Sequence, residues 1–258
     1  GLVKKSIGKV KVGHTGTLDV EAEGVLPIAL GEATKLSSFL MDARKEYRFK
    51  VRFGATTDTG DKAGKVTGTS THIPTYQDCI DICSSFLGVI TQTPPKYSAL
   101  KISGKPAYKL ARAGEEVVMK PRQVTIFALR CTGYHPSESS AEFISECSKG
   151  TYIRTLAEDI SLSLQSLGFV LELARLRVGV FDEASSINLS TVSQENIKAI
   201  LVSKIQNTEV VLDDIPVQEV DVDIAHKVRC GQKVILSLSD TPQLWLKYNG
   251  KVLAIGSI

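Results

Sequence analysis

Apolar and charged residues alternate strictly between Lys45 and Phe53, which is the clearest period along the chain. The residues on one side of an extended backbone would be Tyr47, Phe49, Val51 and Phe53, and those on the other side Glu46, Arg48, Lys50 and Arg52. Because successive side chains of a strand point to opposite faces, this pattern predicts a half-buried strand with Tyr47 facing inward. Gly54 and the polar run at 57–61 predict that the strand ends in a loop.

Apolar residues recur at helical spacing in two other segments. The first opens at Pro74 and Thr75, ends at Gly88 and carries on one side Ile80, Cys83, Phe86 and Leu87. The second follows Arg154, ends at Gly168 and carries Leu156, Ile160, Leu164 and Leu167. Further strands are predicted at 122–132, 141–148 and 169–180. Since helices and strands mix without a βαβ rhythm, we predict an α+β fold with a largely antiparallel sheet.

The last fifty residues differ in character from the rest of the chain. Residues 206–223 contain six acidic residues and no Lys or Arg, and Pro216 lies among them. Beyond this stretch, strands are predicted at 233–238 and 243–258, the latter bent at Asn249-Gly250, a strong hairpin signal. We therefore predict a main domain at 1–210 and a small β module at 211–258.

Composition places the chain among ordinary soluble globular proteins, with 43% apolar and 23% charged residues in 258. No apolar run is long enough to cross a bilayer and no signal peptide is recognisable, so the cytoplasm is the default location. The five cysteines form no CxxC pair and have no His at zinc-ligand spacing. We interpret all five as reduced packing residues and expect neither disulfides nor a metal site: Cys79, Cys83, Cys131, Cys147 and Cys230.

Charge is distributed unevenly, although the net charge of +3 is too small to indicate a nucleic-acid partner. Residues 96–130 contain eight Lys or Arg against two Glu, with Tyr97 and Tyr108 among them. Basic residues interleaved with aromatic ones suit a phosphate backbone and unstacked bases. A solvated face without a partner explains the same charges equally well, so the distribution alone leaves both interpretations open.

A glycine-rich segment near the start of the chain carries the most specific chemical signal. It runs Gly-His-Thr-Gly-Thr-Leu-Asp from Gly13 to Asp19 and continues with Gly-Val-Leu-Pro from Gly24. Glycine at 13, 16 and 24 permits positive φ angles and close approach of another chain, so the segment can hold Asp19 on a backbone-lined loop. Taken alone, an Asp in such a loop is more often a turn or capping carboxylate.

This segment, with Leu-Gly-Glu-Ala-Thr-Lys at 30–35, resembles the catalytic motif of TruB-type tRNA pseudouridine synthases. The resemblance implies that Asp19 is the nucleophile, that the T-loop uridine of tRNA at position 55 is flipped out and isomerised, and that no metal or organic cofactor takes part. It also implies the pseudouridine synthase fold, with a central mixed sheet and a PUA-like C-terminal module. The chain departs from the family at Val20 and Glu23, where Pro and Thr are usual, which affects the shape of the loop.

Three further segments extend the resemblance over residues 8 to about 181. Lys45-Glu46-Tyr47 is similar to a family Lys-x-Tyr whose ring stacks on the target uracil, and residues 147–157 are similar to a signature whose Arg, here Arg154, pairs with the nucleophile. Leu173 aligns with an apolar pocket residue. A core role for Tyr47 and Leu173 fits the sequence as well. Residues 92–101 match an RNA-facing segment, and the residues expected at the RNA are His14, Gly16, Thr17, Leu18, Lys45, Tyr97, Lys101, Tyr152 and Leu173.

The expected partner is therefore tRNA, bound by a monomer through its T stem-loop, with no membrane partner. The resemblance also implies an upstream strand and a Lys-Pro-x-Gly turn, so we expect that the N-terminal element of the catalytic domain is missing here. A non-catalytic tRNA-binding protein or RNA chaperone with the same cleft is the alternative, and a guide-RNA-dependent relative is disfavoured by the short tail after residue 210. A phosphate-cradling NTPase loop is excluded because no GxxxxGK[ST] sequence occurs.

Overall fold

The computed structural model describes residues 2–193, 195–236 and 241–257. Its backbone contacts divide the chain into two compact units. The larger unit comprises Gly13–Ile28 and Leu40–Ser186, and the smaller one Gly1–Val12, Ala29–Phe39 and Ile187–Ile258. The main domain at 1–210 and the module at 211–258 stay predictions.

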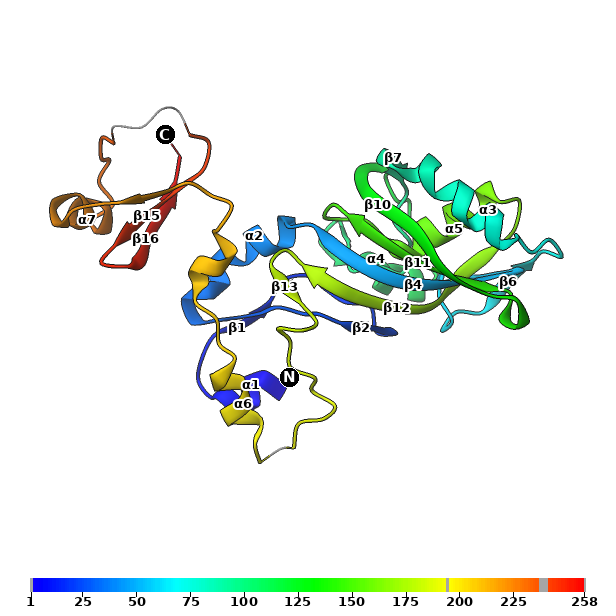
Figure 1. Cartoon of the computed structure of the whole chain (residues 1–258), viewed down its shortest axis with the longest axis horizontal. Helices are drawn as coiled ribbons and strands as arrows, with labels where there is room; N and C mark the ends of the chain where they lie inside the picture. The colour runs from blue at the N-terminus through cyan, green and yellow to red at the C-terminus, as the bar shows by residue number, and fades with distance from the viewer. Residues whose placement is uncertain (1, 194, 237–240, 258) are drawn as a thin grey trace. The chain divides into compact units, whose positions relative to one another are not determined.

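A seven-stranded sheet forms the centre of the larger unit (Figure 1). Its strands in spatial order are β13 (Phe181–Asp182), β12 (Gly168–Val178), β4 (Lys45–Phe53), β11 (Ser140–Cys147), β10 (Arg122–His135) and β7 (Gly88–Gln92), and β2 (Ala22–Gly24) pairs with β12. All neighbours are antiparallel except β2, which runs parallel to β12. This mixed, largely antiparallel sheet with helices confirms the predicted α+β fold class, and β4 has the predicted bounds.

Short helices and hairpins complete the larger unit and its junctions. The helices are α2 (Ser37–Asp42), α3 (Tyr76–Asp81), η2 (Ile82–Phe86), α4 (Ala107–Arg112), η3 (Pro136–Glu138) and α5 (Ile153–Ser163). The paired short strands are β1 (Val12–His14) with β3 (Ile28–Leu30), β5 (Ala55–Thr57) with β6 (Val66–Thr69), and β8 (Lys101–Ile102) with β9 (Lys105–Pro106). The β5–β6 and β8–β9 hairpins lie where the sequence predicted only polar and basic segments.

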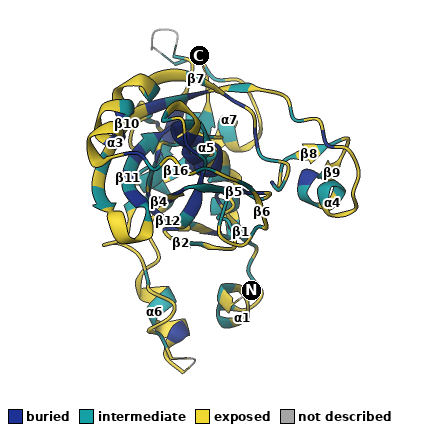
Figure 2. Cartoon of the chain, turned by 90° about the vertical axis from the view of Figure 1, so that its right-hand side faces the viewer, coloured by how far each residue is buried: buried dark blue, intermediate teal, exposed yellow. Residues whose placement is uncertain are grey.

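The core occupies the face of the sheet that α3, η2 and α5 cover, and buried residues gather there in Figure 2. Phe49, Val51 and Phe53 of β4 are at most 2% exposed, as the alternation predicts. Phe49 stacks on Phe143 of β11 with ring centroids 5.5 Å apart. Leu156 on α5 is fully buried in the same cluster. Burying each such side chain contributes about 1.5–3 kcal/mol, which fixes α5 against the sheet.

The opposite face of the sheet carries charged pairs rather than a second core. Lys50 contacts Glu138 at 2.6 Å, and Arg177 contacts Glu46 and Glu146, each at 3.3 Å. Each of these pairs keeps at least one side chain more than a third exposed, so each contributes about 1 kcal/mol or less. The period of two along β4 therefore places one face in the core and the other in solvent.

The first predicted helix forms but turns a different side to the sheet. Thr75 is its N-cap and shares a capping box with Asp78. The buried residues are Cys79 and Cys83, whereas Ile80 is exposed. Leu87, at 49% exposure, follows the helix with an extended backbone. The predicted apolar side was wrong at Ile80 and Leu87. Within α3 the buried position is Cys79, one residue before Ile80, and Leu87 lies beyond the helical segment, where the backbone is extended.

All five cysteines are free thiols. Cys79, Cys83 and Cys147 are buried and Cys131 is half-buried, which fits the predicted packing role. Cys230 is exposed, so its assignment as a packing residue was wrong. It follows helix α7 (Val222–Arg229) and ends that helix as its C-cap.

The smaller unit contains a three-stranded sheet of β14 (Val217–Glu219), β15 (Leu244–Tyr248) and β16 (Lys251–Gly256), flanked by α7 (Val222–Arg229). Asn249 and Gly250, with φ of 49° and 72°, form the predicted hairpin turn between β15 and β16. The strand predicted at 233–238 does not form over 233–236, and residues 237, 238 and 258 lie outside the described residues. Also in this unit are α1 (Leu2–Ile7), η1 (Gly31–Leu36), α6 (Ile197–Ser203) and η4 (Thr208–Val211), with α1 beside α6 (Figure 1).

Candidate active site

The glycine-rich segment folds into a loop between β1 and β2. The backbone N–H and the Oγ1 of Thr15, a fully buried residue, donate to the Pro27 carbonyl at 3.2 and 3.3 Å. The Asp19 carbonyl accepts from the Ala22 N–H at 3.0 Å. Gly16 and Gly24 have the predicted positive φ, whereas Gly13 lies in β1 without one. The loop is closed on its own backbone and holds Asp19 at its far end.

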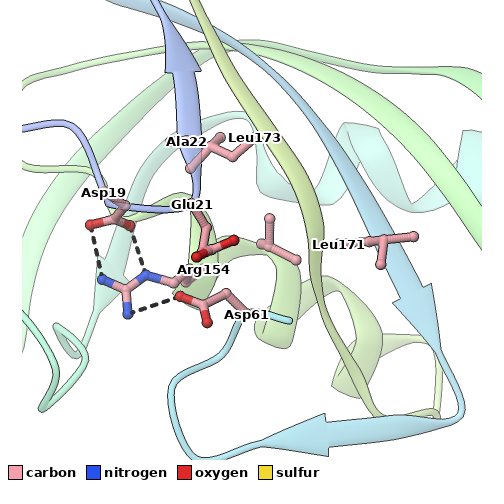
Figure 3. A pocket seen from close by; sticks show the side chains of 8 residues that line it. Asp19, Glu21, Ala22, Asp61, Arg154, Leu171 and Leu173 are labelled. Carbon is pink, nitrogen blue, oxygen red and sulfur yellow. Dashed lines mark hydrogen bonds and ion pairs between the residues drawn. The ribbon is translucent and has the colours of Figure 1, made fainter. Parts of the chain in front are cut away.

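Asp19 and Arg154 form a bidentate ion pair, shown by the dashed lines in Figure 3. Arg154 Nε donates to Asp19 Oδ2 at 2.8 Å, and Nη2 donates to Oδ1 at 3.2 Å. Paired parallel bonds of this kind fix the orientation of the carboxylate as well as its position. The structure thus brings together the two residues that the resemblance paired, although 135 positions separate them.

Arg154 is itself held by two backbone carbonyls and a second carboxylate. Its Nη1 donates to the Thr59 carbonyl at 2.8 Å, and its Nη2 to the Tyr97 carbonyl at 3.0 Å. Asp61 Oδ2 lies 3.8 Å from Nη1. The Arg154 side chain is 5% exposed, against 36% for Asp19. The cation is therefore buried beneath the carboxylate, which keeps one side open to solvent.

A buried glutamine fixes the start of the helix that carries Arg154. Gln92, 1% exposed, accepts from the Tyr152 N–H through Oε1 at 3.1 Å and donates to the Tyr152 carbonyl through Nε2 at 3.4 Å. Tyr152 is the N-cap of α5, two residues before Arg154. Because both backbone groups of Tyr152 are held, the first turn of α5 is anchored to the end of β7.

A small pocket opens beside the ion pair (Figure 3). Its lining residues are Asp19, Glu21, Ala22, Asp61, Arg154, Val170, Leu171 and Leu173. Leu173, which the resemblance assigned to the substrate pocket, thus lies in the same pocket as Asp19 and Arg154. The combination of one oriented carboxylate with apolar side chains suits a flat, weakly polar group that reacts at a carbon centre.

Tyr47 lies on β4, where it pairs with Arg175 of β12, and it packs against the core cluster. Burial raises the pKa of Tyr47, while the Arg175 guanidinium lowers it and the Asp19 carboxylate raises it. The net effect is a raised pKa, which keeps the phenol protonated at neutral pH. Tyr47 is thus suited to stacking and to hydrogen bonding as a neutral phenol.

Lys45, expected at the RNA, points into the protein instead. Its Nζ donates to the carbonyls of Leu40, Met41 and Ala43 at 3.3, 2.6 and 2.6 Å, and the residue is 7% exposed. Burial lowers the pKa of Lys45 to about 8. The geometry therefore gives Lys45 a structural role at the end of α2 rather than an accessible contact.

The other expected RNA contacts lie at or near the surface. His14, Thr17 and Lys101 are exposed, and Leu18 and Gly16 are half-buried in the loop. Tyr97 and Tyr152 are half-buried, and the Arg122 guanidinium lies 4.9 Å from the centre of the Tyr152 ring. Tyr97 contacts Arg154 through its backbone, and Tyr152 precedes it. His14 and Lys101 have no recorded bond to the Asp19–Arg154 pair among the described residues.

Three residues of the site were not predicted. Asp61 lies in the polar run at 57–61 and Gln92 begins the motif at 92–101, but neither was given a role, and Arg175 was not singled out. The available signal was indirect, since a cation at a helix start opposes the helix dipole and requires a partner carboxylate. Gln92 ends β7 and Arg175 lies within β12, and for both the indication was a long polar side chain among apolar neighbours.

The described ranges contain neither a metal-binding cluster nor a membrane-spanning helix. No group of three or more His, Cys, Asp or Glu side chains there is arranged to hold a metal ion. Within the same ranges, no helix has the length and apolar character that a membrane crossing requires.

Comparison with known sequences places this site in a family. Residues 4–153 match the family model described as TruB family pseudouridylate synthase (N terminal domain). The whole chain is 52% identical to tRNA pseudouridine synthase B of Rickettsia bellii strain OSU 85-389 and covers 88% of it. It is 50% identical to the same enzyme of Rickettsia akari strain Hartford, again covering 88% of that protein.

Solved structures with the same fold are more distant in sequence. A chain of the crystal structure of a Cbf5-Nop10-Gar1 complex matches with a TM-score of 0.71 at 23% identity, over 99% of this chain and 72% of that one. A chain of the H/ACA RNP bound to a substrate RNA containing 2′-deoxyuridine matches with a TM-score of 0.70 at 20% identity, over 99% and 71%. At this identity they establish the pseudouridine synthase fold alone.

Proposed function

The chain belongs to the TruB family of pseudouridylate synthases and is therefore an isomerase, and we propose that it converts a uridine in the T loop of tRNA to pseudouridine with Asp19 as the nucleophile. The relatives named above act on tRNA by name, which supports this substrate. The single observation that supports the role of Asp19 best is its bidentate pairing with buried Arg154 at the edge of a pocket.

The reaction requires little more than one well-placed carboxylate. The N-glycosidic bond of uridine breaks, the uracil turns, and C5 replaces N1 in the bond to the sugar. C5 then loses its proton and N1 takes one up, so that substrate and product are isomers. An ionised carboxylate assists either by adding covalently or by stabilising positive charge that develops on the sugar. Arg154 fixes the direction of the Asp19 carboxylate, and the partly exposed side of Asp19 leaves room for the nucleoside.

A uridine in a folded RNA loop must leave its stack to reach Asp19. We propose that the base is flipped into the space bounded by Leu173 and the ring of Tyr47. A neutral phenol fits this role, since it presents a flat face and a hydroxyl without a charge. Residues that contact the surrounding RNA in this proposal are His14, Gly16, Thr17, Leu18, Tyr97, Lys101 and Tyr152, and the protein acts as a monomer.

The test uses unmodified tRNA, the intact protein and pseudouridine mapping at nucleotide resolution. Asp19→Asn keeps the shape of the side chain and removes its charge, so we expect a single T-loop product with the unaltered protein and none with the variant. Binding of tRNA, measured by filter retention, should persist. Asp42→Asn is the control, because Asp42 forms an exposed pair with Lys149 at 2.9 Å and lies outside the pocket.

Two results would contradict the proposal. Product formation by Asp19→Asn at the unaltered rate would remove Asp19 from its role. Binding without product by the unaltered protein would favour a non-catalytic RNA chaperone, an interpretation that the Asp19–Arg154 pair and the family argue against.

A further inference from the structure

Arg175 is a buried arginine whose bonds go to the backbone of the catalytic loop. Arg175 is 1% exposed and is the largest of the fully buried side chains in the described part of the chain. Charged side chains are almost never buried unless they are paired with an opposite charge. The structure records no carboxylate within ion-pair distance of Arg175 among the residues that it describes, and the guanidinium donates to main-chain carbonyls. A buried charge in this position requires an explanation beyond core packing.

The carbonyls that accept from Arg175 lie on both sides of Asp19. Nε donates to the Val25 carbonyl at 2.8 Å, and Nη1 and Nη2 donate to the carbonyls of Thr17 and Gly16 at 3.5 and 3.4 Å. One guanidinium thus joins the beginning of the loop to its end. Asp19 lies on the segment between these two attachments.

The backbone of Arg175 holds the same loop. Its carbonyl accepts from the Val25 N–H at 2.7 Å, and β2 pairs with β12 so that Gly24 lies opposite Arg175. A Cβ atom at Gly24 would lie 2.2 Å from the Arg175 carbonyl oxygen, closer than real Cβ atoms approach. Glycine is therefore required at 24 for the loop to reach β12.

Arg175 also faces the other predicted site residues. β2 pairs with one edge of β12, and β4 pairs with the other edge. Tyr47 is the β4 residue opposite Arg175. Leu173 precedes Arg175 by two positions, so both side chains project from the same face of the strand. One strand thus connects the Asp19 loop, the tyrosine strand and the pocket leucine.

We propose that Arg175 is a positioning residue, which fixes the loop carrying Asp19 against β12 at a set distance from Tyr47 and Leu173. It acts through the loop and does not contact substrate. This inference rests on the proposed function for its catalytic consequence, but its structural consequence is separate: without the guanidinium, the loop at 15–25 opens more often.

The experiment compares Arg175→Lys and Arg175→Met with the intact protein. Lysine keeps the charge but cannot reach three carbonyls from one planar group, and methionine fills similar space without charge or donors. Arg177→Met is the matched control, because Arg177 lies on the same strand but pairs with Glu46 and Glu146 on the charged face. Hydrogen exchange of the backbone amides at 15–25 and single-turnover pseudouridine formation are measured for each protein.

For Arg175→Met we expect exchange at 15–25 to be about tenfold faster, from the loss of buried hydrogen bonds. The single-turnover rate should fall about 100-fold, the cost of misplacing a reacting group by about 1 Å. The tRNA dissociation constant should change less than about threefold, since the contacting surface remains. Arg175→Lys should give intermediate values, and Arg177→Met should match the intact protein. Mere loss of core packing would instead lower stability and binding together and leave the rate of the folded fraction unchanged.

Unchanged exchange at 15–25 in a folded Arg175 variant would overturn the inference, whatever the activity. If Arg175→Met does not fold, Arg175→Lys decides the question below its melting temperature. Should that variant not fold either, Gly24→Ala, which forces β2 away from Arg175, must show the same faster exchange. If the intact protein makes no pseudouridine in tRNA, the proposed function fails while the exchange measurement still tests Arg175.

Discussion

Replacing Arg154 by methionine is the most informative perturbation of this protein. Methionine approximates the length of the side chain but provides neither the charge nor any donor. The change removes two bonds to Asp19 and one each to the carbonyls of Thr59 and Tyr97. It also leaves the carboxylates of Asp19 and Asp61 close together without the cation between them.

The expected loss of stability follows from which of these groups water can reach. Asp19 is 36% exposed, so its oxygens regain water when Arg154 is removed, and most of the cost of its two lost bonds is recovered. The two carbonyls face a side chain that is 5% exposed, and each unsatisfied buried acceptor costs about 1–3 kcal/mol. We therefore expect the free energy of unfolding to fall by about 2–6 kcal/mol, the summed cost of the two unsatisfied carbonyls.

Urea denaturation followed by circular dichroism measures this loss, and a double-mutant cycle with Asp19→Asn isolates the pair. The coupling free energy between positions 19 and 154 should be about 1–3 kcal/mol. Arg177→Met is again the control, since its exposed pairs predict a loss below about 1 kcal/mol. The rate of pseudouridine formation should fall with Arg154→Met even at temperatures at which the variant is folded.

Two results would refute this reasoning. A loss of stability within 1 kcal/mol of that for Arg177→Met would mean that Arg154 is more accessible than its 5% exposure indicates. A coupling free energy near zero would mean that the bidentate contact contributes nothing beyond the backbone bonds.

Two further predictions concern the surroundings of Arg154. Gln92→Leu removes both side-chain hydrogen bonds to the Tyr152 backbone, so the free energy of unfolding should fall by about 2–4 kcal/mol, measured by urea titration. The reaction rate should also fall, measured by single-turnover assays. Unchanged stability would contradict the anchoring role of Gln92. Burial raises the pKa of Glu158 to about 7, so the folded state holds its proton between about pH 4.5 and 7 while the unfolded state releases it, and stability falls as pH rises through this range. Glu158→Gln abolishes this titration and should gain about 2–3 kcal/mol relative to the intact protein between pH 5 and pH 8, and parallel stability curves would contradict the assignment.

Local patterns in the sequence predicted local structure well. The alternation at 45–53 gave β4 its bounds and its buried face, because the period of a strand depends only on neighbouring residues. The Asn249-Gly250 turn formed for the same reason, since both residues adopt positive φ readily. The side of α3 was mispredicted, because Cys79 and Ile80 are neighbouring apolar residues and only the packing of the helix against β10 decides which of them is buried.

The candidate site likewise contains residues that sequence motifs identified and residues whose contacts only the structure shows. Sequence motifs identified Asp19, Arg154 and Leu173, and the structure places all three around one pocket. Lys45 shared a motif with Tyr47, yet the Lys45 ammonium donates hydrogen bonds to three carbonyls at the end of α2. No local pattern in the sequence specifies these bonds.

The sequence by itself determined the long strands of the central sheet, the fold class, the family and the identity of the carboxylate in the glycine-rich loop, since these depend on residue type and short-range spacing. Only the tertiary structure decided which buried polar side chains hold that carboxylate in place. Gln92 and Arg175 bind backbone groups, and backbone groups are the same at every residue, so no letter of the sequence records which carbonyl or N–H will lie within 3.5 Å.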